Sequence, residues 1–242
     1  MPIGRLAVVK PAIIPRDSAP VRHVAIDSGS MRVTWFRLFL TVAITASVAA
    51  PRGQAPPGSR LLDPASLTET APAEYAAVFD TTVGAFVIRV HRSWAPHGAD
   101  RFYNLVKAGF YDQCRFFRVV PKFAIQWGIH GDPAVSAAWN RATLPIDRAI
   151  SSNRRGRVTF AMGTLANTRT TQVFINLGDN SKLDIDGFAP FGEVTSSMII
   201  VERMFSDYLE GIDQGMIQLN GNAFLAKFFP RLDYVKKATI EK

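Results

Sequence analysis

The chain has 242 residues, of which 48% are hydrophobic, with a mean hydropathy of +0.07 and a formal net charge of +8. This composition excludes a largely disordered chain and allows one large domain or two small ones. A single cysteine, Cys114, excludes an internal disulfide and a Cys-rich metal site. No run of Lys and Arg with interleaved aromatic residues is present, which argues against nucleic acid binding.

The first 50 residues resemble a targeting segment. Residues 38–50, LFLTVAITASVAA, are apolar or small, and Arg32 and Arg37 precede them. The run is shorter than the roughly 20 residues that span a bilayer. We therefore expect residues 1–50 to be an extension with a signal peptide, with Met31 as an alternative start of translation, and the protein to be exported to the periplasm. An uncleaved membrane anchor is the alternative.

Residues 51–73 contain five prolines and are expected to form a flexible linker. The folded domain is expected over 74–242. It begins with YAAVFDTTVGAFVIRVH, residues 75–91, two β-rich runs around a turn in which Gly84 can adopt a positive φ. This pattern predicts a β-hairpin.

Residues 95–109 are predicted to form an amphipathic helix. Phe102, Leu105 and Val106 have the i, i+3, i+4 spacing of one apolar face, and Gly109 is a suitable residue just after the helix end.

The stretch RFFRVVPKFAIQWG, residues 115–128, alternates as a strand would, which places Arg118 among apolar neighbours. One face is expected to carry Phe117, Val119 and Pro121, and the other Phe116, Arg118 and Val120. A guanidinium in such a place needs either an ion-pair partner or a groove into which it donates.

The rest of the chain adds short strands and few helices. A loop-rich region, 131–157, is followed by strand-like runs at 156–163 and 170–178. Residues 188–208 predict a short strand and a helix, and residues 222–242 a short helix and a closing strand. Many short strands favour a closed or sandwiched β architecture.

Several motifs in order resemble cyclophilin-type peptidyl-prolyl cis-trans isomerases. FFRVVPKFAIQWG resembles the family's F-H-R-V-x-P-x-F-M-x-Q-G-G stretch, and residues 156–194 resemble its second signature. The likeness is good from Tyr75 to Glu202 and looser beyond. It implies a mainly β fold, a closed eight-stranded antiparallel β-barrel capped by two α-helices, and prolyl isomerisation without a cofactor or metal.

The resemblance also implies the roles of site residues. Arg118 would be the catalytic donor, Gln126 would orient it or hold the substrate carbonyl, and Phe123 would floor the proline pocket. Other residues at substrate-binding positions are Phe117, Ala124, Met162, Gly163, Gln172, Phe174, Leu183 and Phe188.

Departures from the family pattern affect substrate preference. Ala124 stands where many members have Met, Met162 and Gly163 replace an Ala-Asn pair, Lys182 replaces a Trp, and Phe188 a His. The resemblance implies a groove of the kind that binds cyclosporin, and the loss of the Trp predicts weakened binding.

Structural roles remain open for the same residues. Arg118 in an ion pair, Phe123 and Phe174 in the core, and Gln172 as a satisfied polar group at the groove edge are the alternatives. Trp127 and Trp139 are expected to be packing residues, Cys114 a buried hydrophobe, and 179–187 a turn.

Two functions follow. The first is an enzyme that isomerises X-Pro bonds in exported proteins, and the second is a proline-binding chaperone or scaffold with little turnover. The expected partners are proline-containing polypeptides, with no nucleic acid and with membrane contact only through the signal segment. The protein is expected to be a monomer.

Overall fold

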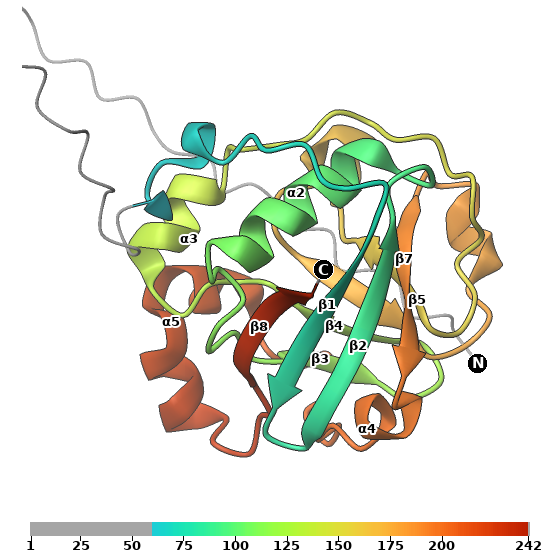
Figure 1. Ribbon diagram of the computed structural model, residues 1–242. Helices are drawn as coiled ribbons and strands as arrows, with labels where there is room; N and C mark the ends of the chain where they lie inside the picture. The colour runs from blue at the N-terminus through green and yellow to red at the C-terminus, as the bar shows by residue number, and fades with distance from the viewer. Residues whose placement is uncertain (1–59, 242) are drawn as a thin grey trace, which may run out of the picture. The chain divides into compact units, whose positions relative to one another are not determined.

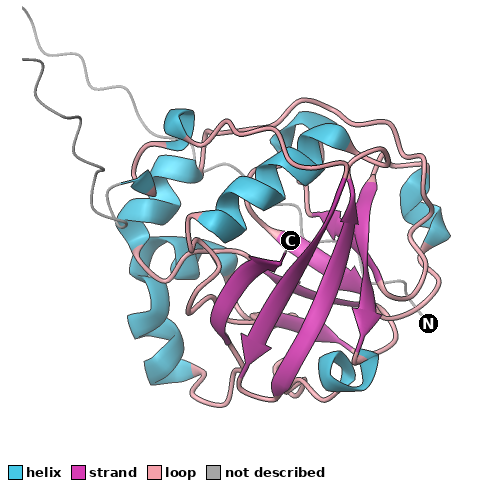
Figure 2. Ribbon diagram, viewed as in Figure 1, coloured by secondary structure: helices cyan, strands magenta, loops and turns pink. Residues whose placement is uncertain are grey.

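A computed structural model describes residues 60–241, so the predicted extension and signal peptide lie outside the described residues. Eight strands form one antiparallel sheet in the order β3-β4-β6-β5-β7-β2-β1-β8. Figure 2 shows the strands curling around a common interior, with the helices outside them. The described part of the chain is thus mainly β with surrounding helices.

The strands are β1 (Glu74–Thr81), β2 (Gly84–His91), β3 (Arg118–Val120), β4 (Ala124–Trp127), β5 (Arg157–Phe160), β6 (Val173–Asn176), β7 (Pro190–Ser196) and β8 (Val235–Glu241). The helices are α2 (Pro96–Lys107), α3 (Pro133–Trp139), α4 (Met198–Glu202) and α5 (Gln214–Phe228), with short 3-10 turns η1 (Pro64–Ser66), η2 (Ala166–Thr168) and η3 (Ser181–Asp184).

The predicted hairpin is confirmed by β1 and β2, which pair in continuous register. Gly84 has a φ of +124° at the turn, where an L side chain would be strained. A side chain there would also meet Ile200, because α4 lies beside this turn (Figure 1). Inward residues such as Phe79 and Phe86 are fully buried and stack at 5.3 Å between ring centres.

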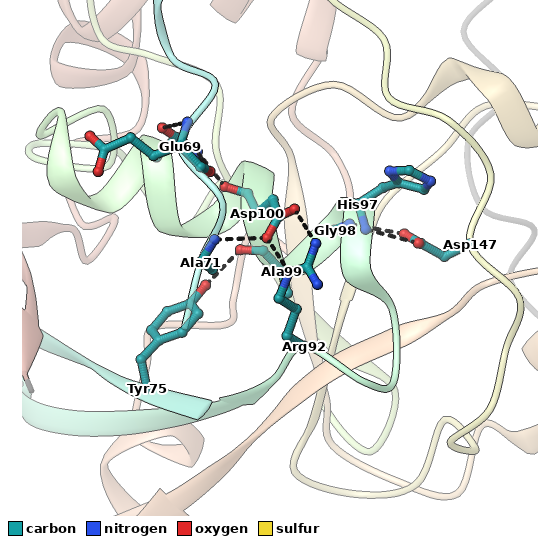
Figure 3. A network of polar contacts seen from close by, with 10 residues as sticks. Glu69, Ala71, Tyr75, Arg92, His97, Gly98, Ala99, Asp100 and Asp147 are labelled. Carbon is teal, nitrogen blue, oxygen red and sulfur yellow. Dashed lines mark hydrogen bonds and ion pairs between the residues drawn. The ribbon is translucent and has the colours of Figure 1, made fainter. Parts of the chain in front are cut away.

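The predicted amphipathic helix is confirmed by α2. Phe102 and Leu105 are fully buried, and Gly109 follows the helix with a φ of +75°. The residue before the helix, Ala95, offers no side-chain cap. Asp147 from a distant loop supplies it, since its carboxylate accepts hydrogen bonds from the backbone amides at the helix start (Figure 3).

The predicted linker differs from the structure over its second half. Leu61, Leu67 and Ala71 are buried in the main core. Asn104 of α2 accepts a hydrogen bond from the Glu69 amide and donates one to the Glu69 carbonyl. Figure 3 shows the neighbouring contacts of this segment with α2. The Pro-rich composition predicted flexibility, but these apolar side chains bury enough surface to order the segment.

The closed barrel is corrected to a curled open sheet. No ladder joins its edge strands β3 and β8. The two edges meet only just outside β3, where an isolated bridge pairs Arg115 with Tyr234 and the Gln113 amide donates to Val235 O over 2.7 Å. Within β3 the Val119 amide donates instead to the Leu209 carbonyl over 3.2 Å, so the loop that carries Leu209 lies beside β3 where β8 would have to pair.

The strand predicted over 115–128 is also shorter than expected. It begins at Arg118 and is broken by a turn at Pro121–Phe123, in which Lys122 has a φ of +64°. Residues 116 and 117 lie outside strand geometry. The predicted alternation therefore fails before β3, since Phe116 and Val119, which were expected on opposite faces, both join the main core, whereas Phe117 lies in the second cluster.

Two helical features exceed the prediction. The loop-rich region contains α3, whose N-cap residue Asp132 accepts a hydrogen bond from the Ala134 amide over 2.8 Å. The helix predicted near residue 222 begins at Gln214 and forms α5. The described residues thus hold four α-helices where the resemblance implied two.

Buried residues fall into three clusters. The main core fills the inside of the curled sheet and the contact with α2. A second cluster joins Phe117 to buried residues of the C-terminal part such as Ile212 and Leu225. A third cluster, here called the pocket cluster, comprises Ala124, Ala161, Phe174, Leu183 and Phe188. No helix among the described residues is long and apolar enough to cross a membrane.

Candidate active site

Three predicted site residues form a row across neighbouring strands. Arg118 of β3 pairs in register with Gln126 of β4, which in turn pairs with Phe174 of β6. Cross-strand partners project to the same face of an antiparallel sheet. Phe174 joins the pocket cluster while its sequence neighbours Val173 and Ile175 are in the main core, so the row lies on the face away from that core.

Arg118 is held in a nearly closed environment. Its side chain is only 4% exposed. Its Nε and Nη2 donate to one carboxylate oxygen of Glu210, over 3.2 and 2.8 Å, and its Nη1 lies 3.5 Å from the Gln126 side-chain oxygen. The guanidinium carbon lies 5.2 Å from the centre of the Phe123 ring, close enough for a cation–π contact. Glu210 thus binds the Nε–Nη2 edge of the guanidinium, and Nη1 makes only a long, weak hydrogen bond.

Gln126 connects the arginine to a second glutamine. Its Nε2 donates to the Gln172 side-chain oxygen over 2.8 Å. Because the amide nitrogen is used in this way, the Gln126 oxygen faces Arg118. The two glutamines therefore form a polar edge beside the arginine.

The pocket cluster lies on the same side as this row. Phe174 and Phe188 meet edge to face at 5.9 Å between ring centres. The partly buried side chains of Phe123 and Met162 pack against the cluster. Apolar side chains beside a few directed donors are what a slot for a proline ring requires.

A buried polar network supports the loop that carries Leu183 and Phe188. The Asn153 side chain donates to Phe188 O over 2.8 Å and to Asp184 over 2.7 Å. Its oxygen accepts from the Thr159 hydroxyl over 2.8 Å. Asn153 is fully buried, so it ties β5 to the pocket loop from behind. The role of Asn153 could not be predicted from the sequence, where its only signal is a polar residue before a strand.

The remaining predicted positions are spread around the cluster. Gly163 is exposed, and its amide donates to the Thr168 hydroxyl over 2.7 Å. Lys182 is exposed on η3, whereas the next residue, Leu183, is buried in the pocket cluster. Phe117 lies in the second cluster with the C-terminal residues and is not brought into the pocket cluster.

The two tryptophans and the cysteine that were expected to be buried packing residues are buried. Trp127 and Trp139 are buried in the main core, as predicted. Cys114 is fully buried, and burial together with the nearby Asp112 charge raises the pKa of its thiol. Within residues 60–241, no group of three His, Cys, Asp or Glu side chains is placed to hold a metal ion.

The comparison with known families agrees with this arrangement. Residues 77–214, more than half of the chain, match the family model described as cyclophilin type peptidyl-prolyl cis-trans isomerase/CLD. A crystal structure of a cyclophilin type peptidyl-prolyl cis-trans isomerase from Cryptosporidium parvum shares the fold, with a TM-score of 0.53 and 19% identity over 70% of this chain and 98% of that chain.

Curated relatives carry the same name. A peptidyl-prolyl cis-trans isomerase of Acinetobacter baylyi is 32% identical over 131 residues, which cover 51% of this chain and 68% of the relative. Peptidyl-prolyl cis-trans isomerase A of Dickeya dadantii is 28% identical over 159 residues, 61% of this chain and 82% of the relative. The chain belongs to the cyclophilin-type peptidyl-prolyl cis-trans isomerases, enzymes that catalyse proline isomerisation.

Proposed function

We propose that Arg118 accelerates rotation about X-Pro bonds by donating a hydrogen bond to the prolyl nitrogen in the twisted state. Rotation breaks amide resonance against a barrier of about 18–20 kcal/mol. In the twisted amide the prolyl nitrogen regains a lone pair that can accept a hydrogen bond. A donor that meets this lone pair stabilises the twisted state more than either planar isomer, so the rate rises.

The single observation that carries this proposal is the row Arg118–Gln126–Phe174 beside the pocket cluster. The hydrogen bond from Nη1 to the Gln126 oxygen is long, at 3.5 Å, and therefore weak. Nη1 can thus still donate to a substrate. The apolar side chains of the pocket cluster would hold the proline ring at the end of the row. No proton transfer or covalent step is needed. A cyclophilin-type structure from Cryptosporidium parvum, with 18% identity and a TM-score of 0.51, was solved in the presence of the dipeptide Ala-Pro.

The test is the Arg118→Ala variant, assayed without a coupling protease. A charge-assisted hydrogen bond contributes about 1.5–3 kcal/mol, so turnover should fall roughly ten- to hundredfold. Affinity for a proline peptide should change little, because the contact forms in the twisted state. Arg118→Lys should recover little, since one ammonium does not reproduce the planar fork.

The matched control is Arg157→Ala. Arg157 lies in the same sheet and pairs with Glu193 at 2.5 Å, away from the pocket cluster. Its removal should lower the melting temperature without lowering turnover per folded molecule. If Arg118→Ala behaves like this control and keeps near-normal turnover while folded, the catalytic role is wrong.

A binding function with little turnover is the second candidate. The observation that favours it is the low exposure of Arg118, whose Nε and Nη2 are occupied by Glu210. The groove would then recognise proline-containing chains without aligning the donor. Peptide binding together with an isomerisation rate near the uncatalysed one would support this second candidate.

We further propose that the substrates are exported proteins, on the basis of the apolar segment at 38–50 and the arginines before it. The chain made in a secreting host should be cleaved so that the mature protein starts between about residues 50 and 61. N-terminal sequencing of the secreted material measures this. A retained N-terminus in the membrane fraction would contradict cleavage and favour an anchor.

A further inference from the structure

Glu210 contacts the proposed catalytic donor from outside the motifs that define the family resemblance. It is separated from Arg118 by 92 positions in the chain. Its side chain is 48% exposed, while that of Arg118 is 4% exposed. The carboxylate thus lies between the guanidinium and solvent, and a single oxygen accepts from both Nε and Nη2.

The loop that carries Glu210 is fastened on both sides of it. The carbonyl of Leu209 accepts a hydrogen bond from the Val119 amide over 3.2 Å, so the loop is tied to β3 next to Arg118. On the other side, Ile212 is buried in the second cluster with Phe117. These two attachments flank Glu210 directly and restrict where its carboxylate can lie.

The backbone at this point is itself constrained. Leu209 has a φ of +50°, a strained conformation for a non-glycine residue that persists only where the surrounding structure holds it. Tyr208 packs edge on against Phe205 and Phe229, at 4.9 and 5.1 Å between ring centres. The strained residue is therefore held by packing before it and by the Val119 contact at its own carbonyl.

We propose that Glu210 is a positioning residue for the isomerisation, an inference that rests on the proposed role of Arg118. By binding the Nε–Nη2 edge, the carboxylate sets the rotation of the guanidinium plane and directs Nη1 towards Gln126 and the pocket cluster. An arginine side chain has many rotamers, and fixing it in advance removes an ordering cost from the twisted state. The contact thus acts on turnover through Arg118 without touching substrate.

The experiment compares Glu210→Ala and Glu210→Gln in the full chain. We expect Glu210→Ala to lower kcat by roughly tenfold while KM and the affinity for a proline peptide stay unchanged. Glu210→Gln keeps shape and one acceptor, so it should recover part of the rate and guards against a folding defect in the Ala variant. The Arg118 Nε–H resonance, followed by NMR, should move in each variant.

The matched control is Asp207→Ala. Asp207 lies in the same loop and pairs at 3.6 Å with Arg231, both of them well exposed. This variant should keep the wild-type kcat and the wild-type Arg118 resonance. In an Arg118→Ala background, Glu210→Ala should cause no further loss of rate, since the positioned group is absent.

The outcomes separate the two proposals. If Arg118→Ala lowers turnover but the Glu210 variants keep the wild-type kcat, the positioning role is wrong and the proposed function stands. A kcat that rises in Glu210→Ala would also overturn positioning, because it would mean that the carboxylate blocks the donor. Normal turnover in Arg118→Ala would refute the proposed function itself.

Discussion

The side chain of Gln126 donates to the side-chain oxygen of Gln172 over 2.8 Å, and this contact decides which end of the Gln126 amide faces Arg118. An amide can present either an acceptor or a donor. Beside a guanidinium, only the acceptor is favourable. Gln172 thereby acts on the arginine through Gln126.

This relationship predicts the effect of Gln172→Ala. Without its acceptor, the Gln126 amide is free to turn and present its NH2 group towards Arg118. We expect kcat to fall several-fold, with peptide affinity changed less, and Gln172→Glu to retain most of the rate because it keeps an acceptor. Steady-state kinetics on the two variants measure this. Equal rates for Gln172→Ala and the wild type would show that Gln172 does not orient Gln126.

The second prediction is that Lys182, which stands where the family pattern has a Trp, weakens the binding of cyclosporin. Lys182 is exposed at the rim of the pocket cluster, next to buried Leu183. Its flexible ammonium has neither the flat apolar ring of a Trp nor the indole N–H at a fixed position on that ring. We expect weak binding by the wild type and tighter binding by Lys182→Trp. Lys182→Ala is the control, since it removes the charge without adding an indole. Tight binding by the unmodified protein in calorimetry would contradict the assignment of this loop.

Asn153 is predicted to be required for the shape of the pocket loop. Asn153→Ala leaves the buried Phe188 carbonyl and the Thr159 hydroxyl without a partner. Each unsatisfied group costs about 1–3 kcal/mol, so we expect a destabilisation of about 2–6 kcal/mol for the two groups. Urea unfolding measures it. A loss of less than about 1 kcal/mol in the free energy of unfolding would mean that water molecules satisfy the Phe188 carbonyl and the Thr159 hydroxyl in the variant.

Asp100 gives the stability a dependence on pH. Burial raises the pKa of this carboxyl, but the hydrogen bonds from Arg92 and the Ala71 amide and the Arg92 charge outweigh it, so the pKa lies below its ordinary value of 3.8. Folding therefore favours the carboxylate. This stability is present above about pH 4 and is lost as the pH falls through the folded pKa.

The comparison for this prediction is Asp100→Asn. The amide keeps an acceptor for Ala71 but loses the charge that binds Arg92 over 2.7 and 2.9 Å. We expect the variant to be less stable than the wild type at pH 7 and the difference to shrink towards pH 2. Urea titrations at several pH values measure both. A difference that is constant across this range would contradict the assigned cause.

The elements that local patterns define could be predicted from the sequence. The β1–β2 hairpin and α2 depend on alternation, helical spacing and glycines at 84 and 109, all of which are visible within about ten residues. The row of Arg118, Gln126 and Phe174 follows from the family motifs. Asp132 followed by Pro133 is also a local signal for a helix start, and it lies inside the region predicted to be loop-rich.

Long-range features could not be predicted in the same way. Nothing near Glu210 in the sequence indicates that its carboxylate reaches Arg118, because the contact depends on how the loop after α4 returns to β3. The gap between β3 and β8 could not be predicted either, because the Val119 amide of β3 bonds the Leu209 carbonyl, a contact between segments far apart in the sequence. The burial of Leu61 and Leu67 could not be predicted, because the prolines around them indicate a flexible linker.

The pairing of β1 with β8 has a consequence for the order of folding. The first strand of the sheet lies between β2, its neighbour in the chain, and a strand more than 150 residues later, Val235–Glu241. Contacts of such sequence separation form slowly, because a long loop must close first. As the chain is synthesised, β1 keeps one edge unpaired until residues 235–241 have emerged. Docking of this last strand is expected to be the slow step of folding, with a rate that depends on loop closure and not on local propensity.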